Sequence, residues 1–523
     1  MLEASASHQR DTVDETSLLL PGSSTPSLGG DSTSSKPWIL LVTLLAIGVA
    51  ATDLGSFLAQ PPKTRMYESI VCLRYYERAD PSKIQSNGVI PEELCKINAV
   101  QDTVAMIFGW QDLWDALPGI FLAVPYGVLA DKYGRKWILA LGLIGAECSL
   151  LWIMFVCYIQ LPLVLTWLSS AFLIIGGGPL VIVAIMFTML SDIVPTEKRT
   201  IIFVYVAASA LVAELIAPVL SSILMKKGVW LPIILGAVIE GLTILIVLFL
   251  PETLHLRNSG PRETPGGKEQ HPVQMASEYS SKERSGFKAQ IQKLLDTLKV
   301  LKRDISLTLV ILTFLVNRLG RQSGDLLLRY SSKRYHWTIQ KAALLLSIRA
   351  GLNLVTLLVL VPVLSMIMIQ WFSMSPQRTD LLISRGSVIF TTLGFFVIGF
   401  SPTPALLVGG LVIYTLGTGF AAAMRSIAVF MVGGQTSHDI ARLSATIAIL
   451  ESLGMLLSGP FLSFIFRWGM KLGDAWLGMP FLLSGMLFFL ITVITYTISL
   501  RDLNAAQTPP SATEDIPSPV HSP

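Results

Sequence analysis

The chain has 523 residues, of which 52% are hydrophobic and only 14% are charged, and its mean hydropathy is +0.62. A soluble globular protein carries about 25% charged residues, so this composition excludes an ordinary soluble enzyme. The net charge of +4 is too small and too scattered to indicate a surface that binds nucleic acid, and four cysteines predict neither a metal site nor a disulfide framework. We therefore expect a helical membrane protein with many spans.

Long apolar runs predict twelve membrane-spanning helices, because each span needs about 20 consecutive apolar residues. The first six spans are expected at residues 38–58, 103–130, 137–157, 161–190, 200–224 and 230–250. The second six are expected at residues 305–328, 342–370, 381–400, 405–432, 443–466 and 475–500. The predicted fold class is all-α, with two six-helix halves.

One of these spans contains an interruption. Gly176-Gly177-Gly178-Pro179 falls near the middle of the fourth span, where we expect the helix to bend or to expose its backbone, or the glycines to allow close packing.

Polar segments divide the chain into five parts. We expect a disordered cytoplasmic tail, a six-helix half, a cytoplasmic linker, a second six-helix half and a second disordered cytoplasmic tail, at residues 1–36, 37–250, 251–303, 304–500 and 501–523. Within the linker, apolar residues from Phe287 to Leu301 recur at helical spacing among lysines. This pattern predicts an amphipathic helix that lies on an anionic membrane surface or caps the bundle.

Two cysteines, Cys72 and Cys95, lie in the long first loop, which is expected to run from residue 59 to residue 102. Such a pair suits an oxidising side of the membrane. Their spacing alone leaves a disulfide and two free thiols as alternatives. Cys148 and Cys157 fall within the third span and are expected to be packing residues.

A charged loop follows the second span and runs from Gly127 through Ala130, "GVLA", to "DKYGRK" at residues 131–136. Gly127 is expected to let a neighbouring helix approach, Gly134 to permit a tight turn, and Asp131 to accept from a helix N-terminus or pair with a cation. Arg135 and Lys136 are expected to hold the loop on the cytoplasmic side. We predict a latch that forms in one state of a rocking transporter and breaks in the other.

This loop resembles the signature loop of the major facilitator superfamily, G-x-L-A-D-[RK]-x-G-[RK]-[RK], at every defined position. The charged stretch from Asp192 to Arg199 is expected to meet it. A shift that places Ala217-Pro218 on Gly459-Pro460 also places the fourth span on the tenth. The resemblance implies two parallel halves with a substrate site between them near the midplane, and no cofactor.

A finer resemblance rests on less of the chain. Cys95, Val100-Gln101 before the second span, and Glu214 in the fifth look like the proton-coupled folate and heme carrier group, and the segment 327–352 looks like fungal members of the superfamily. The implied partners are a small organic substrate, protons and the lipid bilayer, with no nucleic acid, and the protein is expected to be a monomer.

Ionisable side chains inside spans are costly, so they are candidates for function. The superfamily architecture makes the third and sixth spans peripheral, which leaves Glu214, Glu451 and Asp53 as the candidate proton-coupling acids. Burial raises the pKa of a carboxyl group and a nearby arginine lowers it, so an acid that meets an arginine in one state only would bind and release a proton. Glu214 is the first choice, and a structural acid bonded to a hydroxyl is the alternative.

The cations of three later spans are expected to hold the substrate. Helical spacing places Arg318, Arg321 and Gln322 on one face of the seventh span together with Asp325, while Arg349 and Arg425 lie on the eighth and tenth spans. Arginine binds carboxylates and phosphates through two parallel hydrogen bonds, so these side chains predict a site for an anionic group. Structural salt bridges are the alternative for Arg318 and Arg425.

These features predict a secondary active transporter that moves a small organic molecule by alternating access, driven by protons. The sequence has no G-x-x-x-x-G-K-[ST] loop, which argues against ATP, and no HExxH or GxSxG, which argues against an enzyme. Efflux of a fungal secondary metabolite or toxic compound is slightly favoured over uptake of an organic anion, and a non-transporting sensor is the third alternative. We expect the plasma membrane, with the vacuolar membrane as the alternative.

Overall fold

The computed structural model describes residues 37–253, 305–432 and 440–497, apart from residues 87 and 195. Within these ranges the chain is helical and has no strand. Ten helical stretches are long and apolar enough to cross a membrane, two of which, Ile339–Gln370 and Pro404–Met431, each join consecutive helices. Two further spans are divided into shorter pieces. Both predicted tails and the predicted linker helix lie outside the described residues.

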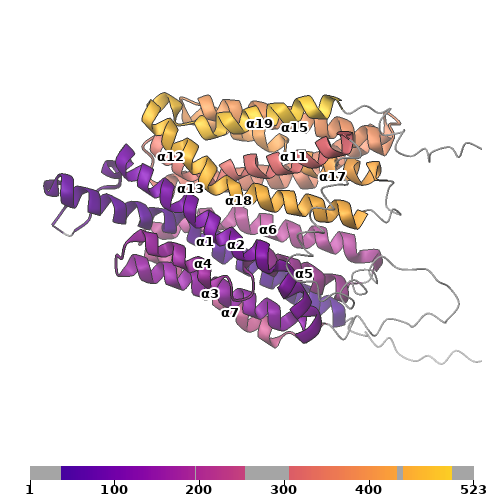
Figure 1. The fold of residues 1–523 in the computed structure, drawn as a ribbon, viewed down its shortest axis with the longest axis horizontal. Helices are drawn as coiled ribbons and strands as arrows, with labels where there is room; N and C mark the ends of the chain where they lie inside the picture. Colours follow the sequence, from indigo (N-terminus) through magenta and orange to yellow (C-terminus); the bar gives the residue numbers. More distant parts are fainter. Residues whose placement is uncertain (1–36, 87, 195, 254–304, 433–439, 498–523) are drawn as a thin grey trace, which may run out of the picture.

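The helices form two halves of six spans, which confirms the predicted fold class (Figure 1). The first half contains α1 (Pro37–Ala79), α2 (Asn98–Tyr133), α3 (Arg135–Tyr158), α4 (Ser169–Phe172), α5 (Gly178–Ile193), α6 (Thr196–Met225) and α7 (Trp230–Phe249). The second half contains α11 (Ile305–Arg321), α12 (Leu327–Arg334), α13 (Ile339–Val355), α14 (Val361–Gln370), α15 (Pro376–Phe400), α16 (Pro404–Leu416), α17 (Phe420–Met431), α18 (Ile440–Leu472) and α19 (Met479–Thr497). The pairs α4 with α5, α11 with α12, α13 with α14, and α16 with α17 each make one interrupted span.

The interruptions of the fourth and tenth spans occupy equivalent places in the two halves. Between α4 and α5, Gly176, Gly177 and Gly178 have φ values of +86°, +81° and +74°, a conformation that side chains other than glycine rarely adopt. Between α16 and α17 the helix is interrupted at residues 417–419. The internal repeat read from the sequence therefore extends to the places where its helices break.

The first span is longer than predicted, and its expected end at Leu58 is wrong. The helix α1 continues through Pro61 and Pro62 to Ala79. A proline inside a helix removes one backbone donor, so Pro62 leaves the carbonyl of Leu58 without its helical partner. The hydroxyl of Ser221 on α6 donates to that carbonyl at 2.9 Å, and this bond lets the helix continue. Most of the expected first loop is therefore helix.

The seventh span is not the regular helix that the sequence suggested. The helix α11 ends at Arg321, and residues 322–326 form a 3-10 segment before α12. The expectation that Arg321, Gln322 and Asp325 share one α-helical face is therefore wrong. A π-helical turn at Thr356–Leu360 divides the eighth span in a similar way.

The two halves meet at one end of the bundle, which we call the cap end because α1 extends past it to Ala79; the opposite end, which carries residues 131–136, is the loop end (Figure 1). Near the cap end, α2 crosses α18 where a Cβ on Gly109 would lie 2.6 Å from that of Ser463. Further toward the cap end, Asp102 and Arg467 form a two-bonded ion pair, with N–O distances of 2.7 and 2.8 Å.

Burial changes along these same helices toward the loop end. None of the residues of α14 is buried, and Met455 on α18, one turn before Gly459, is exposed. The hydrogen bonds and ion pairs of Asn98, Asp102 and Glu214 that join the halves lie at the cap end and near the centre. The structure is thus closed at the cap end and open toward the loop end.

We expect Ser221→Ala to lower the thermal stability of the protein, because it leaves the buried carbonyl of Leu58 without a donor. The cost of an unsatisfied buried polar group is about 1–3 kcal/mol. Ser209→Ala is a matched control on the same helix, since Ser209 bonds to the carbonyl of Val206 within its own helix. Thermal melting of both variants in detergent tests this, and equal melting temperatures would contradict it.

Candidate functional site

Arg135 is the centre of the charged group at the loop end. Its side chain is only 4% exposed, and it forms an ion pair with Asp192 at the end of α5. It also approaches Asp131 at 3.4 Å and donates to the carbonyl of Thr188 at 3.1 Å. Arg135 therefore ties the second, third and fourth spans together, and Asp192 belongs to the stretch that was expected to meet the loop.

The residue that accepts from the helix N-terminus is Glu252 rather than Asp131. The Oε1 atom of Glu252, just after α7, accepts from the backbone N–H of Arg135 at 3.0 Å, where α3 begins. Asp131 is half-exposed and makes the longer contact with Arg135. Sequence reasoning missed Glu252, although an acid directly after the sixth span was the available signal.

The other members of the loop have unequal surroundings. Gly134 has a φ of +109° and lies so close to the Glu252 carboxylate that a side chain there would overlap it. Lys136 lies with its Nζ atom 5.1 Å from the ring centre of Trp137. Apart from its own stretch of helix, no atom of the described chain lies within 4 Å of the position of a Cβ on Gly127. The close helix approach expected at Gly127 is therefore absent from this conformation.

An ion pair joins the two halves near the middle of the bundle. The Oε1 atom of Glu214 on α6 lies 2.6 Å from the Nη2 atom of Arg349 on α13, and both side chains are mostly buried. Gly324 lies so close to Arg349 that a Cβ there would overlap the guanidinium, so this glycine leaves room for it. The structure thus brings one predicted acid against one predicted cation from the opposite half.

The other two predicted acids lie in different settings. Glu451 on α18 pairs with Arg425 on α17 at 2.9 Å, so this ion pair stays inside the second half. Asp53 on α1 is within electrostatic range of Glu214, but among the described residues it has no ion pair. It lines a cavity of about 340 Å³ inside the first half, with walls that are otherwise apolar apart from Thr52 and Thr243.

The predicted cations of the seventh span also separate. Arg321 donates to the side chain of Asn317 at 3.1 Å and to the carbonyl of Thr418 at 3.2 Å, and Gln322 donates to Asp325. Arg318 is exposed, and its Nη2 atom contacts the sulfur of Met455 at 3.5 Å. In the part of the chain that the structure describes, no carboxylate lies within ion-pair distance of Arg318. It is therefore the predicted cation with the most freedom to meet a ligand.

Two charged groups near the cap end were not singled out from the sequence. Asp102 and Arg467 join α2 to α18, and Arg329 on α12 is buried with its guanidinium 4.5 Å from the ring centre of Phe108. Their positions at the ends of predicted spans made them look like ordinary interface charges. Only the spatial arrangement of α2, α12 and α18 distinguishes them.

Cys72 and Cys95 form a disulfide, with their Cα atoms 5.4 Å apart. Cys148 and Cys157 are free, and Cys157 is buried. Among the described residues, no group of three or more His, Cys, Asp or Glu is placed to hold a metal ion.

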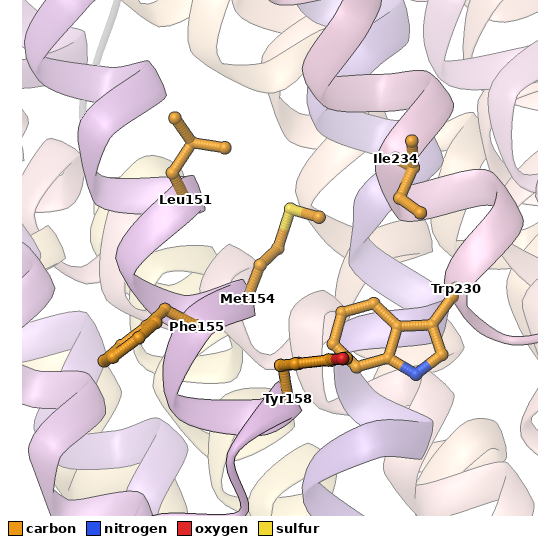
Figure 2. A pocket seen from close by; sticks show the side chains of 6 residues that line it. All are labelled: Leu151, Met154, Phe155, Tyr158, Trp230 and Ile234. Carbon is orange, nitrogen blue, oxygen red and sulfur yellow. The ribbon is translucent and has the colours of Figure 1, made fainter.

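A second hollow, of about 460 Å³, lies on the outside of the first half between α3 and α7. Figure 2 shows its six lining side chains, with Tyr158 and Trp230 close together and Met154 on the same helix as Tyr158. The rings of Tyr158 and Trp230 meet edge to face at 5.9 Å. No charged side chain lines this hollow, so it suits contact with lipid rather than a transport path.

Comparison with known proteins agrees with this fold and this loop. The family model of the Major Facilitator Superfamily matches residues 97–459. The MFS efflux pump atnC of Emericella nidulans is 33% identical over 488 residues, which cover 92% of each chain. The chain belongs to the Major Facilitator Superfamily. It is therefore a transporter, and it spans nearly the full length of this relative.

Other relatives and structures are more distant. The efflux pump ustT of Aspergillus flavus is 28% identical and covers 83% of each chain. Among solved structures, the nucleoside transporter NupG matches with a TM-score of 0.57 at 14% identity, covering 87% of this chain and 98% of the other, and shares the fold alone. The resemblance to folate and heme carriers is not supported, because these curated relatives are named efflux pumps.

The two glycines of the loop offer a matched test. Gly134→Ala introduces a side chain at positive φ against Glu252, and this sparsely populated conformation alone costs about 1–3 kcal/mol, so we expect a lower melting temperature. Gly127→Ala meets nothing in this conformation and should leave the melting temperature unchanged or raised, because alanine favours a helix more than glycine does. Similar losses of stability in the two variants would be evidence against the described latch.

Proposed function

We propose that the protein exports a small organic molecule in exchange for protons. The observation that carries this proposal is the ion pair between Glu214 and Arg349, because it joins the halves that must separate during alternating access. The names of the relatives atnC and ustT, both fungal efflux pumps, support export of a fungal secondary metabolite or a toxic compound. Uptake is not favoured by these relatives.

The proposed coupling uses two states of one carboxylate. In the conformation closed at the cap end, Arg349 neutralises Glu214. When the cap end opens, α6 and α13 separate, and a carboxylate left in the bundle without its arginine favours the neutral form and takes up a proton from outside. Return of Arg349 releases that proton toward the loop end. Asp53, within electrostatic range of Glu214, and Glu451 are proposed as additional acids on this path.

We assign the substrate an acidic or strongly polar group that binds Arg318. This side chain is exposed, lies inside a membrane span and contacts the weak acceptor sulfur of Met455. Arg425, also exposed, lies on the same half but is partly neutralised by Glu451. Arg321, Gln322 and Arg349 are proposed to hold the shape of the binding site through their bonds to neighbouring residues.

The proposed orientation places the loop end in the cytoplasm and the cap end outside the cell. The disulfide between Cys72 and Cys95 supports this, because disulfides persist on an oxidising side. The layout keeps the linker at residues 251–303 and both tails in the cytoplasm. We propose a monomer in the plasma membrane.

Glu214→Gln should abolish proton-driven transport while the protein remains folded, because glutamine keeps the shape of the side chain but binds no proton. Proteoliposomes with an internal pH dye measure proton movement on addition of each member of a panel of small organic acids. Glu147→Gln is the control, since Glu147 lies on α3, which packs against helices of its own half. Proton movement at the wild-type rate in Glu214→Gln would exclude Glu214 from coupling.

Arg318→Ala should raise the apparent KM for an acidic substrate roughly ten- to a hundredfold, because hydrogen bonds to charged groups contribute about 1.5–3 kcal/mol. The maximal rate should change much less, because the arginine binds the substrate before and after rocking. Arg378→Ala, at an arginine near the start of α15, serves as the control for loss of one positive charge. A KM shift of the same size in both variants would remove Arg318 from the binding site.

A further inference from the structure

The part of α1 beyond Pro62 forms one rigid unit with the short 3-10 helix η3 (Glu92–Lys96), and we call this unit the outer cap (residues 64–79 and 91–97). The disulfide between Cys72 and Cys95 joins its two pieces. A buried ion pair joins them again, because the Nζ atom of Lys96 lies 2.7 Å from Oε1 of Glu68 and both side chains are 2% exposed or less. The cap therefore moves with the first half.

Glu92 connects the outer cap to the opposite half. Its Oε1 atom accepts from the backbone N–H of Ile339, the first residue of α13, at 2.6 Å, and lies 3.0 Å from the Nζ atom of Lys96. Its Oε2 atom lies 3.3 Å from Nε of Arg65 on α1. One carboxylate thus holds both pieces of the cap and the N-terminus of a helix in the second half, where a negative charge is favourable.

A second contact lies beside the first. The Nζ atom of Lys333 on α12 donates to the backbone carbonyl of Lys96, and Lys333 is buried in this position. Breaking the two contacts removes the hydrogen bonds from the cap to α12 and α13 but leaves the Glu68–Lys96 pair and the disulfide inside the cap. The cap therefore keeps its own structure when these two bonds to the second half break.

The same helix that Glu92 holds also carries Arg349. Ile339 begins α13 and Arg349 lies ten residues further along, which places the two contact points about 15 Å apart on one continuous helix. The first half therefore grips α13 twice, at its outer end through Glu92 and near the centre through Glu214. When α13 moves away from the first half, the contacts with Glu92 and with Glu214 are therefore expected to break together.

We propose that Glu92 is a positioning residue of the transport cycle, which sets how firmly the cap end closes and, through α13, when Glu214 and Arg349 separate. The part about Glu214 rests on the proposed function, whereas the closing role of Glu92 does not. Weakening the Glu92 contact shifts the protein toward the state that is open at the cap end.

Two reporter cysteines measure this shift, one in intact cells and one in inside-out vesicles, each in full-length protein with Cys148→Ser and Cys157→Ser and the disulfide retained. Ala105→Cys is the outer reporter, because Ala105 is 0% exposed and packs within the apolar core of the second half. Ala422→Cys is the inner reporter, because it is exposed one turn before Arg425. Membrane-impermeant maleimide is added from outside for Ala105→Cys, and to inside-out vesicles for Ala422→Cys.

In the Glu92→Ala variant, we expect maleimide to label Ala105→Cys about tenfold faster than in the parent protein, because a charge-assisted hydrogen bond between the halves is lost. Labelling of Ala422→Cys should slow at the same time, since opening at one end closes the other. Lys333→Met, which leaves the cap intact, should act in the same direction. Glu93→Ala, at the neighbouring acid, is the matched control and should change neither rate.

Unchanged labelling of Ala105→Cys in Glu92→Ala would overturn the proposal, whatever the result for Lys333→Met. Faster labelling of both reporters would also overturn it, because that result indicates general loosening rather than a shift between two states. These measurements need no substrate and no proton gradient. They therefore stand or fall separately from the transport assays of Glu214→Gln.

Discussion

The ion pair between Glu214 and Arg349 is the interaction that holds the two halves together near the middle of the bundle. A charge in the interior of a membrane protein is costly unless a partner neutralises it, so each half has a reason to keep the other in place at this point. The pair between Arg425 and Glu451 meets the same requirement inside one half, so movement of the halves relative to each other leaves it intact. The Glu214–Arg349 pair thus makes two positions of the same two bundles electrostatically different, and Asp102–Arg467 is a second ion pair between the halves at the cap end.

The sequence predicted most of the fold because each span needs its own apolar residues, and that requirement is local. The prediction from sequence failed where a residue distant in the chain compensated for a local feature that normally ends a helix. The helix α1 continues through Pro61 and Pro62, and Ser221 on α6, far along the chain, donates to the carbonyl that Pro62 leaves without a partner. The 3-10 segment after Arg321 could not be predicted from the sequence either, because its residues follow a pattern of apolar and polar residues that a regular helix would also show.

The candidate site was predictable by residue type but not by partner. Arg318, Arg349 and Arg425 all looked alike in sequence, since each was an arginine within an apolar run. The packing of α6 against α13 and of α17 against α18 distinguishes them. Arg349 bridges the halves, Arg425 pairs with an acid of its own half, and Arg318 has no carboxylate within ion-pair distance among the described residues. Glu252 shows the reverse case, because an ordinary acid at the end of a span became the acceptor for the N-terminus of α3.

The crossing of α2 and α18 at Gly109 and Gly459 lies off centre. Gly109 is about 17 Å from the start of α2 at Asn98 and about 36 Å from its end at Tyr133. Halves that pivot where their backbones touch act as levers with unequal arms, so a given rotation opens the loop end roughly twice as wide as the cap end. In the proposed orientation, the opening on the cytoplasmic side is then broader than the opening on the outer side.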